Sequence, residues 1–498
     1  MTFPPPPVAA SSPARQRLLL AAVMSGLMLA MLDQTIVGTA LPRVVEDLDG
    51  TSLYLWVVTA YLVPATVTLP LYARLSDRFG RRRLLLIGMA LFLAGSALAG
   101  VAPSMGWLVV ARAVQGTGAG ALESLSFILM ADLYRGRRNA ALQGAMAGMM
   151  GVAFIAGPLV GGFLTDHVGW RACFTVNLPI GAAAMAGIAA CLPSSVGRSE
   201  RRDVPLDLAG IGLLTAAVSL LLIGLNEKTH AAVGGGLPGW TELRTGGLVA
   251  VGLALGVALI AVERRAAAPI IPLKLLADRR VGAICLAGTT ASFALFCGAL
   301  LLPRYFQFAR NVSATHSGLL IYPLLLGLVV SVNVGAALTV RRLEFRWPIV
   351  AGMGLVALGA LGFATFDEAT PDGISLVFMA LLGVGVGPAL SGLQIALQRT
   401  VAPHQIGAAM GTLLLLRQLG GAVALAAAET IYATRLHDAA AAGVGTRQAA
   451  ATATGTGIFV VALAGSAVAA VALLSLPRGA GRLAEVKEPE RRPALAAA

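Results

Sequence analysis

Charged residues are scarce in this chain. Only 12% of its 498 residues are Asp, Glu, Lys or Arg, whereas 57% are hydrophobic. A water-soluble protein carries about a quarter of its residues as charges, because polar groups must cover its surface. The shortage therefore excludes a soluble globular fold and indicates a protein embedded in a membrane.

Cysteine and histidine are rare as well. The chain has four cysteines, at Cys173, Cys191, Cys285 and Cys297, and none lies in a CxxC motif or beside a histidine. We therefore expect no disulfide framework and no zinc site. No HExxH spacing, phosphate-binding loop or nucleophile/base set occurs either. These absences argue against an enzyme and predict no metal and no cofactor, with an ion gradient as the energy source in place of ATP.

Long apolar runs fill the chain instead. A bilayer core of about 30 Å requires roughly 20 helical residues to cross it. Fourteen such stretches begin near Leu18, Leu53, Leu84, Trp107, Ala140, Ala172, Leu206, Gly246, Val281, His316, Trp347, Ile374, Gly407 and Gly455. The sequence predicts an all-α integral membrane protein of fourteen transmembrane helices, and the seventh and eighth stretches are the weakest.

The net charge of +13 indicates topology. With the N-terminus in the cytoplasm, 27 of the 37 Lys and Arg residues fall on cytoplasmic segments, 8 on external segments and 2 within helices. This distribution satisfies the positive-inside rule, so both termini are predicted to be cytoplasmic. The basic residues thus indicate topology, and we expect the lipid bilayer as a partner and no nucleic acid.

The spans are ordered six, two, six. We expect a disordered tail at 1–17, a six-helix bundle at 18–192, a linker with two extra helices at 193–280, a second six-helix bundle at 281–476 and a tail at 477–498. Long external loops are predicted at 226–245 and 429–454. The loops after the second and tenth spans, ARLSDRFGRRRLL and LTVRRLEFRWPIV, resemble each other. Parallel repeats of this kind usually place a substrate site between the halves.

The basic loop after the second span contains Asp77, Arg78, Gly80 and Arg81. Gly80 permits a tight turn, and Asp77 can pair with Arg81 four residues on. This string resembles the best-known motif of the major facilitator superfamily, with Ala73 where the family usually has Gly. The resemblance implies a role in conformational switching; the alternative is a topology anchor only.

Two polar motifs interrupt the fourth and first spans. LVVARAVQGTGAG contains Arg112 and Gln115, and LDQTIVGTALP contains Asp33 and Gly38, where the family usually has Asn. The first string resembles the superfamily motif that is thought to take part in proton transfer. The second resembles a motif characteristic of the superfamily's fourteen-helix drug:proton antiporter branch. An intramembrane arginine costs about 2.5 to 3.5 kcal/mol and needs a partner, and Asp33 lies at a similar depth. The resemblance implies that Asp33 carries a proton and that Arg112 adjusts the pKa of Asp33. The alternative is a permanent salt bridge that only holds the helices together.

Glu123 lies eleven residues beyond Arg112. Eleven helical steps return to within about 20° of the same face, roughly 16 Å deeper in the membrane. Related sequences often carry Pro or a neutral residue near this position, so Glu123 is a departure from them. It is a candidate second proton or cation site, and the alternative is a carboxyl neutralised by hydrogen bonds.

The fifth span carries Gly157, Pro158, Gly161 and Gly162. These residues resemble the exporter motif that distinguishes antiporters from symporters in the family, with Ala153 in place of one Gly. Small residues allow close helix packing and a proline can bend a helix, so packing alone also explains the pattern physically. Only the resemblance makes the motif evidence for export.

Several other intramembrane side chains are candidates for substrate contact. Polar groups in spans can bind substrate or bond between helices, and methionines can line an adaptable pocket or fill an ordinary core. The candidates are Met28, Gln34, Gln115, Gln394, Gln398 and Arg417.

The resemblance implies a proton-coupled antiporter that exports amphipathic or lipophilic small molecules, a multidrug efflux protein with a role in antibiotic resistance. It also favours a bacterial plasma membrane, with a small-molecule substrate and protons as partners and a proton gradient as the energy source, and we expect a monomer. The alternative is a dedicated exporter of one endogenous metabolite, antibiotic or lipid, and the helix residues do not distinguish it from a multidrug exporter. A proton-symport nutrient importer would share the fold and the basic loop, and the resemblance of the fifth span argues against it.

Overall fold

The computed structural model describes residues 12–48, 53–134, 136–193, 196, 207–233, 242–266, 269, 271, 273–312, 316, 319–367, 370–402, 405–477 and 479–483. Within these residues the regular elements are helices, and one antiparallel bridge joins Glu344 to Arg482. The all-α prediction is therefore confirmed.

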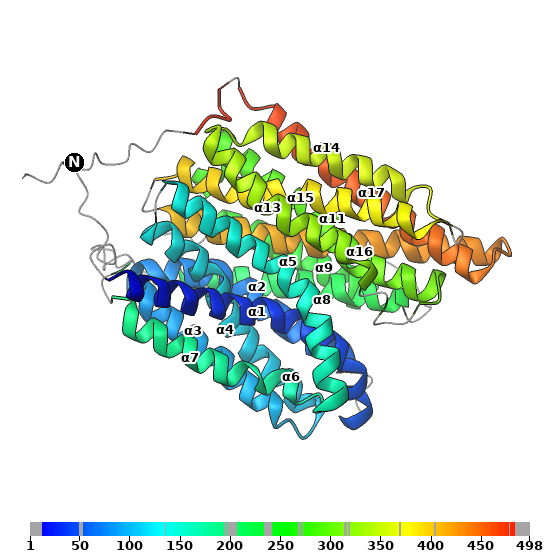
Figure 1. Cartoon of the computed structure of the whole chain (residues 1–498), viewed down its shortest axis with the longest axis horizontal. Coiled ribbons are helices and arrows are strands. Elements are labelled where there is room, and N and C mark those ends of the chain that lie inside the picture. The colour runs from blue at the N-terminus through cyan, green and yellow to red at the C-terminus, as the bar shows by residue number, and fades with distance from the viewer. Residues whose placement is uncertain are drawn as a thin grey trace, which may run out of the picture.

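The helices form two halves with an insertion between them in the chain (Figure 1), and each half contains six long or broken helices. The first half contains α1 (Pro13–Leu48), α2 (Tyr54–Phe79), α3 (Arg81–Gly100), α4 (Met105–Leu133), α5 (Gly136–His167) and a broken sixth helix, α6 (Ala172–Thr175) with α7 (Asn177–Cys191). The insertion contains α8 (Leu208–Val233), η2 (Leu243–Gly247), α9 (Leu248–Glu263) and α10 (Leu273–Leu276). The second half contains α11 (Arg279–Arg304), η3 (Tyr305–Ala309), α13 (Tyr322–Arg341), α14 (Arg346–Phe363), α15 (Asp372–Thr400), α16 (Ile406–Ala441) and α17 (Thr446–Leu474).

Eleven helices among the described residues are long and apolar enough to cross a membrane. Of the remaining long helices, α4 is rich in glycine and polar residues, and the apolar part of α8 spans only Ala209–Leu225. The multi-pass membrane architecture is confirmed, and the count of fourteen spans stays a prediction.

The prediction of a long external loop at 429–454 is wrong. Helix α16 continues to Ala441 and α17 begins at Thr446, so only a short turn separates them. The segment is rich in alanine, the strongest helix former, and has no proline. Its turn uses Gly443 at φ +72°, a conformation that glycine adopts without strain. Of the other predicted loop, 226–245, the part up to Val233 is helical, and residues 234–241 lie outside the described ranges.

The two halves meet mainly through α2 against α16 and α5 against α13, with smaller contacts of α4 on α16 and α5 on α15. We call the end of the bundle where α1 begins and α17 ends the termini side, and the opposite end the far side. Near the termini side, a Cβ atom at Gly411 would meet Pro70 and Ala73 of α2. Closer to the middle, Gly148 of α5 lies against Asn333 of α13.

The far side is arranged differently. The last turns of α1 pack in an apolar cluster with Met105, Trp170 and Phe174, and all buried members of this cluster belong to the first half. In Figure 1 the far ends of α1 and of the α16–α17 pair lie well apart. The contacts described between the halves thus close the termini side.

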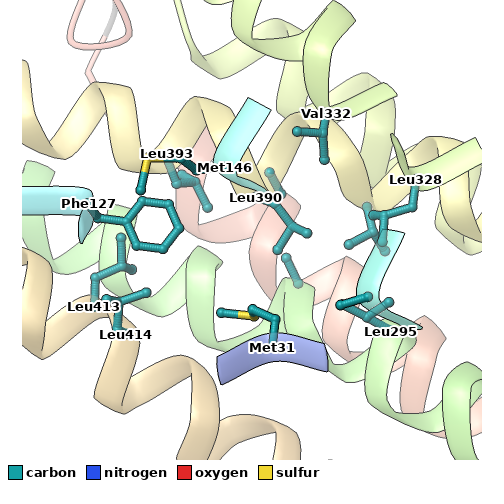
Figure 2. Close-up of a cluster of buried hydrophobic side chains, with 14 of the residues drawn as sticks. Met31, Phe127, Met146, Leu295, Leu328, Val332, Leu390, Leu393, Leu413 and Leu414 are labelled. Carbon is teal, nitrogen blue, oxygen red and sulfur yellow. The ribbon is translucent and has the colours of Figure 1, made fainter. Parts of the chain in front are cut away.

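A buried apolar cluster fills the interface between the halves (Figure 2). The first half contributes Met31 from α1, Phe127 from α4 and Met146 from α5. The second half contributes Leu295, Leu328, Val332, Leu390, Leu393, Leu413 and Leu414. We call these ten residues the central apolar cluster.

The extra helices cover one seam between the halves. Helix α8 packs on α9 and also on α2 and α16. A small apolar cluster joins Val67 of α2, Leu214 and Val218 of α8, Leu259 of α9 and Leu415 of α16. Helix α9 buries little of its own surface, which is typical of a helix that faces lipid.

Candidate functional site

Asp33 of α1 and Arg112 of α4 form an ion pair inside the first half. Arg112 NH1 donates to Asp33 Oδ2, and both residues are buried, with Arg112 1% and Asp33 0% exposed. Both lie about 30 Å from the termini side, counted at 1.5 Å per residue from Pro13 and from Leu133. The sequence predicts a similar depth for Asp33 and Arg112, and in the structure the two side chains are in contact.

Three further polar residues complete this pair. Gln115 Nε2 donates to Asp33 Oδ1 at 2.8 Å, and Asn177 Nδ2 donates to the same oxygen at 3.0 Å. Both amides also donate to Ser96 Oγ, at 2.7 and 3.0 Å. Arg112 NH1 in turn donates to Gln115 Oε1 at 2.6 Å. We call Asp33, Arg112, Gln115, Ser96 and Asn177 the polar core of the first half.

Aromatic rings enclose the arginine. The guanidinium lies 4.1 Å from the ring centroid of Tyr61 and 5.8 Å from that of Phe174, and Arg112 Nε donates to the Val57 carbonyl. Cation–π contacts of this kind stabilise a charge removed from water. The Tyr61 hydroxyl donates to the Ala30 carbonyl at 2.9 Å. Among the described residues, every group that contacts this ion pair belongs to the first half.

The glycines of α4 bring the helices close enough for these contacts. A Cβ at Gly116 would collide with the Tyr61 carbonyl, and one at Gly120 with the Ala65 carbonyl, so this face of α4 lies directly on the α2 backbone. Gly118 faces α3, where a Cβ would collide with the Phe92 amide. The QGTGAG string is therefore a packing surface for two neighbours, which positions Arg112 and Gln115.

Glu123 occupies a different environment. It is 6% exposed, and its carboxylate makes no hydrogen bond and no ion pair within 4 Å to another described residue. It interacts electrostatically with Arg417 of α16, in the other half. Glu123 lies about 15 Å from the termini side and Arg417 about 17 Å, counted along their helices from Leu133 and Ile406. The sequence identifies no partner for Arg417, and in the structure Glu123 is an opposite charge that acts on it across the interface.

A profile of the Major Facilitator Superfamily matches residues 23–425, most of the chain. The chain belongs to the major facilitator superfamily. Similar proteins include the multidrug transporter protein MdtP of Bacillus subtilis, 33% identical over 80% of this chain and 73% of its own length. The tetracenomycin C resistance and export protein of Streptomyces glaucescens is 31% identical over 84% of this chain and 76% of its own length.

A solved structure has the same superfamily fold. The human organic anion transporter MFSD10 aligns over 92% of this chain and 100% of its own, with a TM-score of 0.60 and 18% identity. This similarity supports the fold alone. The family match and the relatives, which are transporters and not enzymes, place the chain among the transporters of this superfamily.

The superfamily loop motif ties the α2–α3 turn to α4. Gly80 links the two helices at φ +90°, a conformation that favours glycine. Arg81 forms an ion pair with Asp132 near the end of α4 at 2.9 Å, and it donates to Ser76 Oγ. Arg78 lies over the ring of Phe79. The side chain of Asp77 lies outside the described residues, so its pairing with Arg81 stays a prediction.

The exporter-like motif of α5 packs against α1. A Cβ at Gly157 would collide with the Thr35 side chain, whose hydroxyl donates to the Ala153 carbonyl at 2.9 Å. The Gly161 carbonyl accepts from Thr165, whereas Gly162 faces open space. The side chain of Pro158 lies outside the described residues.

The remaining candidates for substrate contact are dispersed. Gln394 is buried and its Oε1 has no described partner, and Gln398 Nε2 lies 3.7 Å from the Met410 sulfur. Met28 packs beside the apolar core, and Gln34 is half-buried near the Tyr61 phenol. Gln115 is enclosed within the polar core. No contact in the structure tests whether these side chains bind substrate.

Ser96, Asn177 and Tyr61 were not identified from the sequence. Each is a single polar group within an apolar stretch, which was the available signal. Asn177 lies at the first turn of α7, directly after the break that separates it from α6. Its Oδ1 is buried without a described partner.

A second polar contact lies on the far side. The carboxylate of Asp47 accepts from Trp170 Nε1 and from Arg171 NH1, both at 2.9 Å, beside a depression of about 280 Å³. The hydrogen bond from Trp170, together with that from Arg171, lowers the pKa of Asp47 from its usual value. This contact ties the last turns of α1 to the turn before α6.

Proposed function

We propose that the protein is a proton-coupled antiporter that exports amphipathic or lipophilic small molecules by alternating access. The observation that carries this proposal is its 33% identity, over 80% of the chain, to a protein named a multidrug transporter. The relative named multidrug resistance protein 3, 30% identical over 84% of the chain, supports the same class.

The central apolar cluster supports the substrate class. It lies between the halves and contains Met31 and Met146, whose flexible side chains can repack around varied apolar ligands. Met28 and Gln34 of α1, Gln394 and Gln398 of α15 and Arg417 of α16 belong to helices that meet near this cluster, and we retain them as proposed substrate contacts.

The proposed proton-coupling residues are Asp33, Arg112 and Glu123. Buried carboxylates in transporters are the groups that take up and release protons. In this proposal Asp33 holds a proton within the first half, with Arg112 setting its electrostatic environment, and Glu123 is the second site. The termini side is the cytoplasmic side of the plasma membrane, as the distribution of basic residues predicts.

A direct test is efflux of a fluorescent lipophilic cation from bacterial cells that lack their own efflux pumps. The proposal expects cells that express this protein to extrude the dye, and extrusion to stop when a protonophore collapses the proton gradient. Uptake of the compound driven by the proton gradient would favour the importer alternative instead.

A dedicated exporter of one endogenous product is the second candidate. It is supported by the 31% identity to the tetracenomycin C resistance and export protein. Extrusion of a single antibiotic-like compound, with no response to a panel of unrelated lipophilic cations, would favour this candidate over multidrug efflux.

A further inference from the structure

Asp33 of α1 and Glu123 of α4 are both buried, but they have different partners. Asp33 receives donors from Arg112, Gln115 and Asn177, all in the first half. Relative movement of the halves leaves those contacts intact. Glu123, in contrast, has Arg417 of the second half as the charge that interacts with it.

Apolar packing shows that Glu123 and Arg417 face each other. Phe127 follows Glu123 by four residues and Leu413 precedes Arg417 by four, so each apolar residue lies on the same helix face as its charged neighbour. Phe127, Leu413 and Leu414 all belong to the central apolar cluster (Figure 2), and α4 contacts α16 directly. The charged residues therefore lie one helical turn above this apolar contact, toward the far side.

Arg417 needs an opposite charge. Among the residues that the structure describes, its Nε is buried without a hydrogen-bond partner, and its side-chain stem packs near Gly288 of α11. A buried N–H group without an acceptor is costly, and an attractive carboxylate across the interface offsets part of the cost of burying the charge. The ionised form of Glu123 thus favours the arrangement in which the halves touch on the termini side.

We propose that Glu123 and Arg417 form the electrostatic contact through which proton binding opens the termini side. Glu123 is the group that takes the proton, and Arg417 is a positioning residue that provides the opposing charge. This inference rests on the proposed antiport and assigns it a specific coupling contact.

The sign of the coupling follows from charge alone. When a proton adds to the Glu123 carboxylate, the neutral acid no longer attracts Arg417, and the closed termini side loses that stabilisation. Once the halves part, Glu123 meets water on that side and releases the proton, and the ionised carboxylate again favours closure. A proton taken from the far side is thereby delivered to the termini side.

Other ionisable groups near Glu123 are few. Tyr61 of α2 interacts with it electrostatically. On α1 the intramembrane charge is Asp33, which is paired with Arg112, and α3 and α5 carry charged residues only near their ends. The response to pH is therefore expected to follow Glu123.

Cross-linking between the halves tests this proposal without any substrate. The full-length chain, with its four native cysteines replaced by alanine, receives the pair Gly148→Cys and Asn333→Cys. A Cβ at position 148 lies 3.4 Å from the Asn333 side chain, so a short thiol cross-linker can join the two when the halves touch. Cross-linking is measured in vesicles from about pH 5 to pH 9, a range wide enough for a buried carboxyl to titrate.

The parent pair is expected to cross-link several-fold less at the acid end. Glu123→Gln is expected to lose this pH dependence and to remain at the low acid level, and Arg417→Gln to lower cross-linking at alkaline pH. Glu123→Asp, which keeps a carboxylate, is expected to retain the pH response. Asp47→Asn, which removes a far-side carboxylate whose contacts lie within the first half, is the matched control and is expected to keep the parent profile.

Any one of three outcomes would overturn the proposal. The first is a parent profile that does not change with pH. The second is an unchanged pH profile in Glu123→Gln, and the third is an unchanged alkaline level in Arg417→Gln. If cross-linking follows the expectation but no compound moves protons, the proposed antiport fails while the Glu123–Arg417 contact stands. If the protein exports dye but the cross-link does not respond to pH, the antiport stands and the Glu123–Arg417 proposal fails.

Discussion

Asp33 and Arg112 form an ion pair that is closed off from solvent and held by side chains of a single six-helix half. The acid and the base come from α1 and α4, and the amides of Gln115 and Asn177 satisfy the carboxylate from α4 and α7. This arrangement joins helices within the half. It leaves the contact between the halves to other residues, mainly those of α2 on α16 and of α5 on α13.

Arg112→Gln is expected to destabilise the protein strongly. The substitution leaves Asp33 buried without its opposite charge, and breaking a buried pair in this way costs about 3 to 5 kcal/mol. Thermal unfolding of the detergent-solubilised protein measures the loss. The double variant with Asp33→Asn is expected to recover part of the stability, because neither charge then remains unpaired. A double variant less stable than Arg112→Gln would contradict this view of the pair.

Gly116→Ala is expected to cost about 1 to 3 kcal/mol of stability through overpacking. Its methyl group would collide with the Tyr61 carbonyl, whereas a methyl group at Gly106 in the same helix meets nothing within 4 Å. Gly106→Ala is therefore the matched control and is expected to unfold at the parent temperature. Equal unfolding temperatures for the two variants would show that α4 does not pack on α2 as described.

The far-side contact of Asp47 predicts a dependence on pH. Its pKa in the folded protein lies below the ordinary value of 3.8, so its stabilising contribution is present above that value and is lost as the pH falls through the folded pKa. The unfolding temperature of the parent should exceed that of Asp47→Asn at neutral pH, and the difference should vanish in strong acid. Arg171→Gln should behave similarly, since it removes one of the two donors. A difference that persists in strong acid would contradict this assignment.

The predicted membrane orientation can be tested by thiol labelling. In a background without native cysteines, Ala442→Cys lies in the exposed turn between α16 and α17, and Ser475→Cys lies just after α17 on the termini side. A membrane-impermeant thiol reagent added to intact cells is expected to label position 442 and not position 475. The reverse pattern would place the termini outside.

Much of the helix pattern could be predicted from hydropathy. The predicted starts near Trp347 and Gly407 differ by one residue from Arg346 and Ile406, because a bilayer-length apolar run has sharp polar ends. The predicted start of α17 near Gly455 lies nine residues after the observed start at Thr446. The intervening segment contains polar residues that lower its hydropathy, but its alanines favour a helix.

The site was predictable only within one half. Asp33 and Arg112 could be paired from their depth, since two isolated charges in apolar helices require partners. Glu123 and Arg417 could not be paired in this way, because their approach depends on how two separately packed bundles dock. Asn177 was missed because its role depends on the break between α6 and α7, which no hydropathy pattern indicates.

The most direct test of the account is proton release from everted vesicles when lipophilic compounds are added. Substrate is expected to trigger proton movement in the parent, and this movement is expected to be lost in Asp33→Asn and in Glu123→Gln at equal expression. A well-expressed, folded parent that moves no protons with any compound would contradict proton-coupled multidrug export.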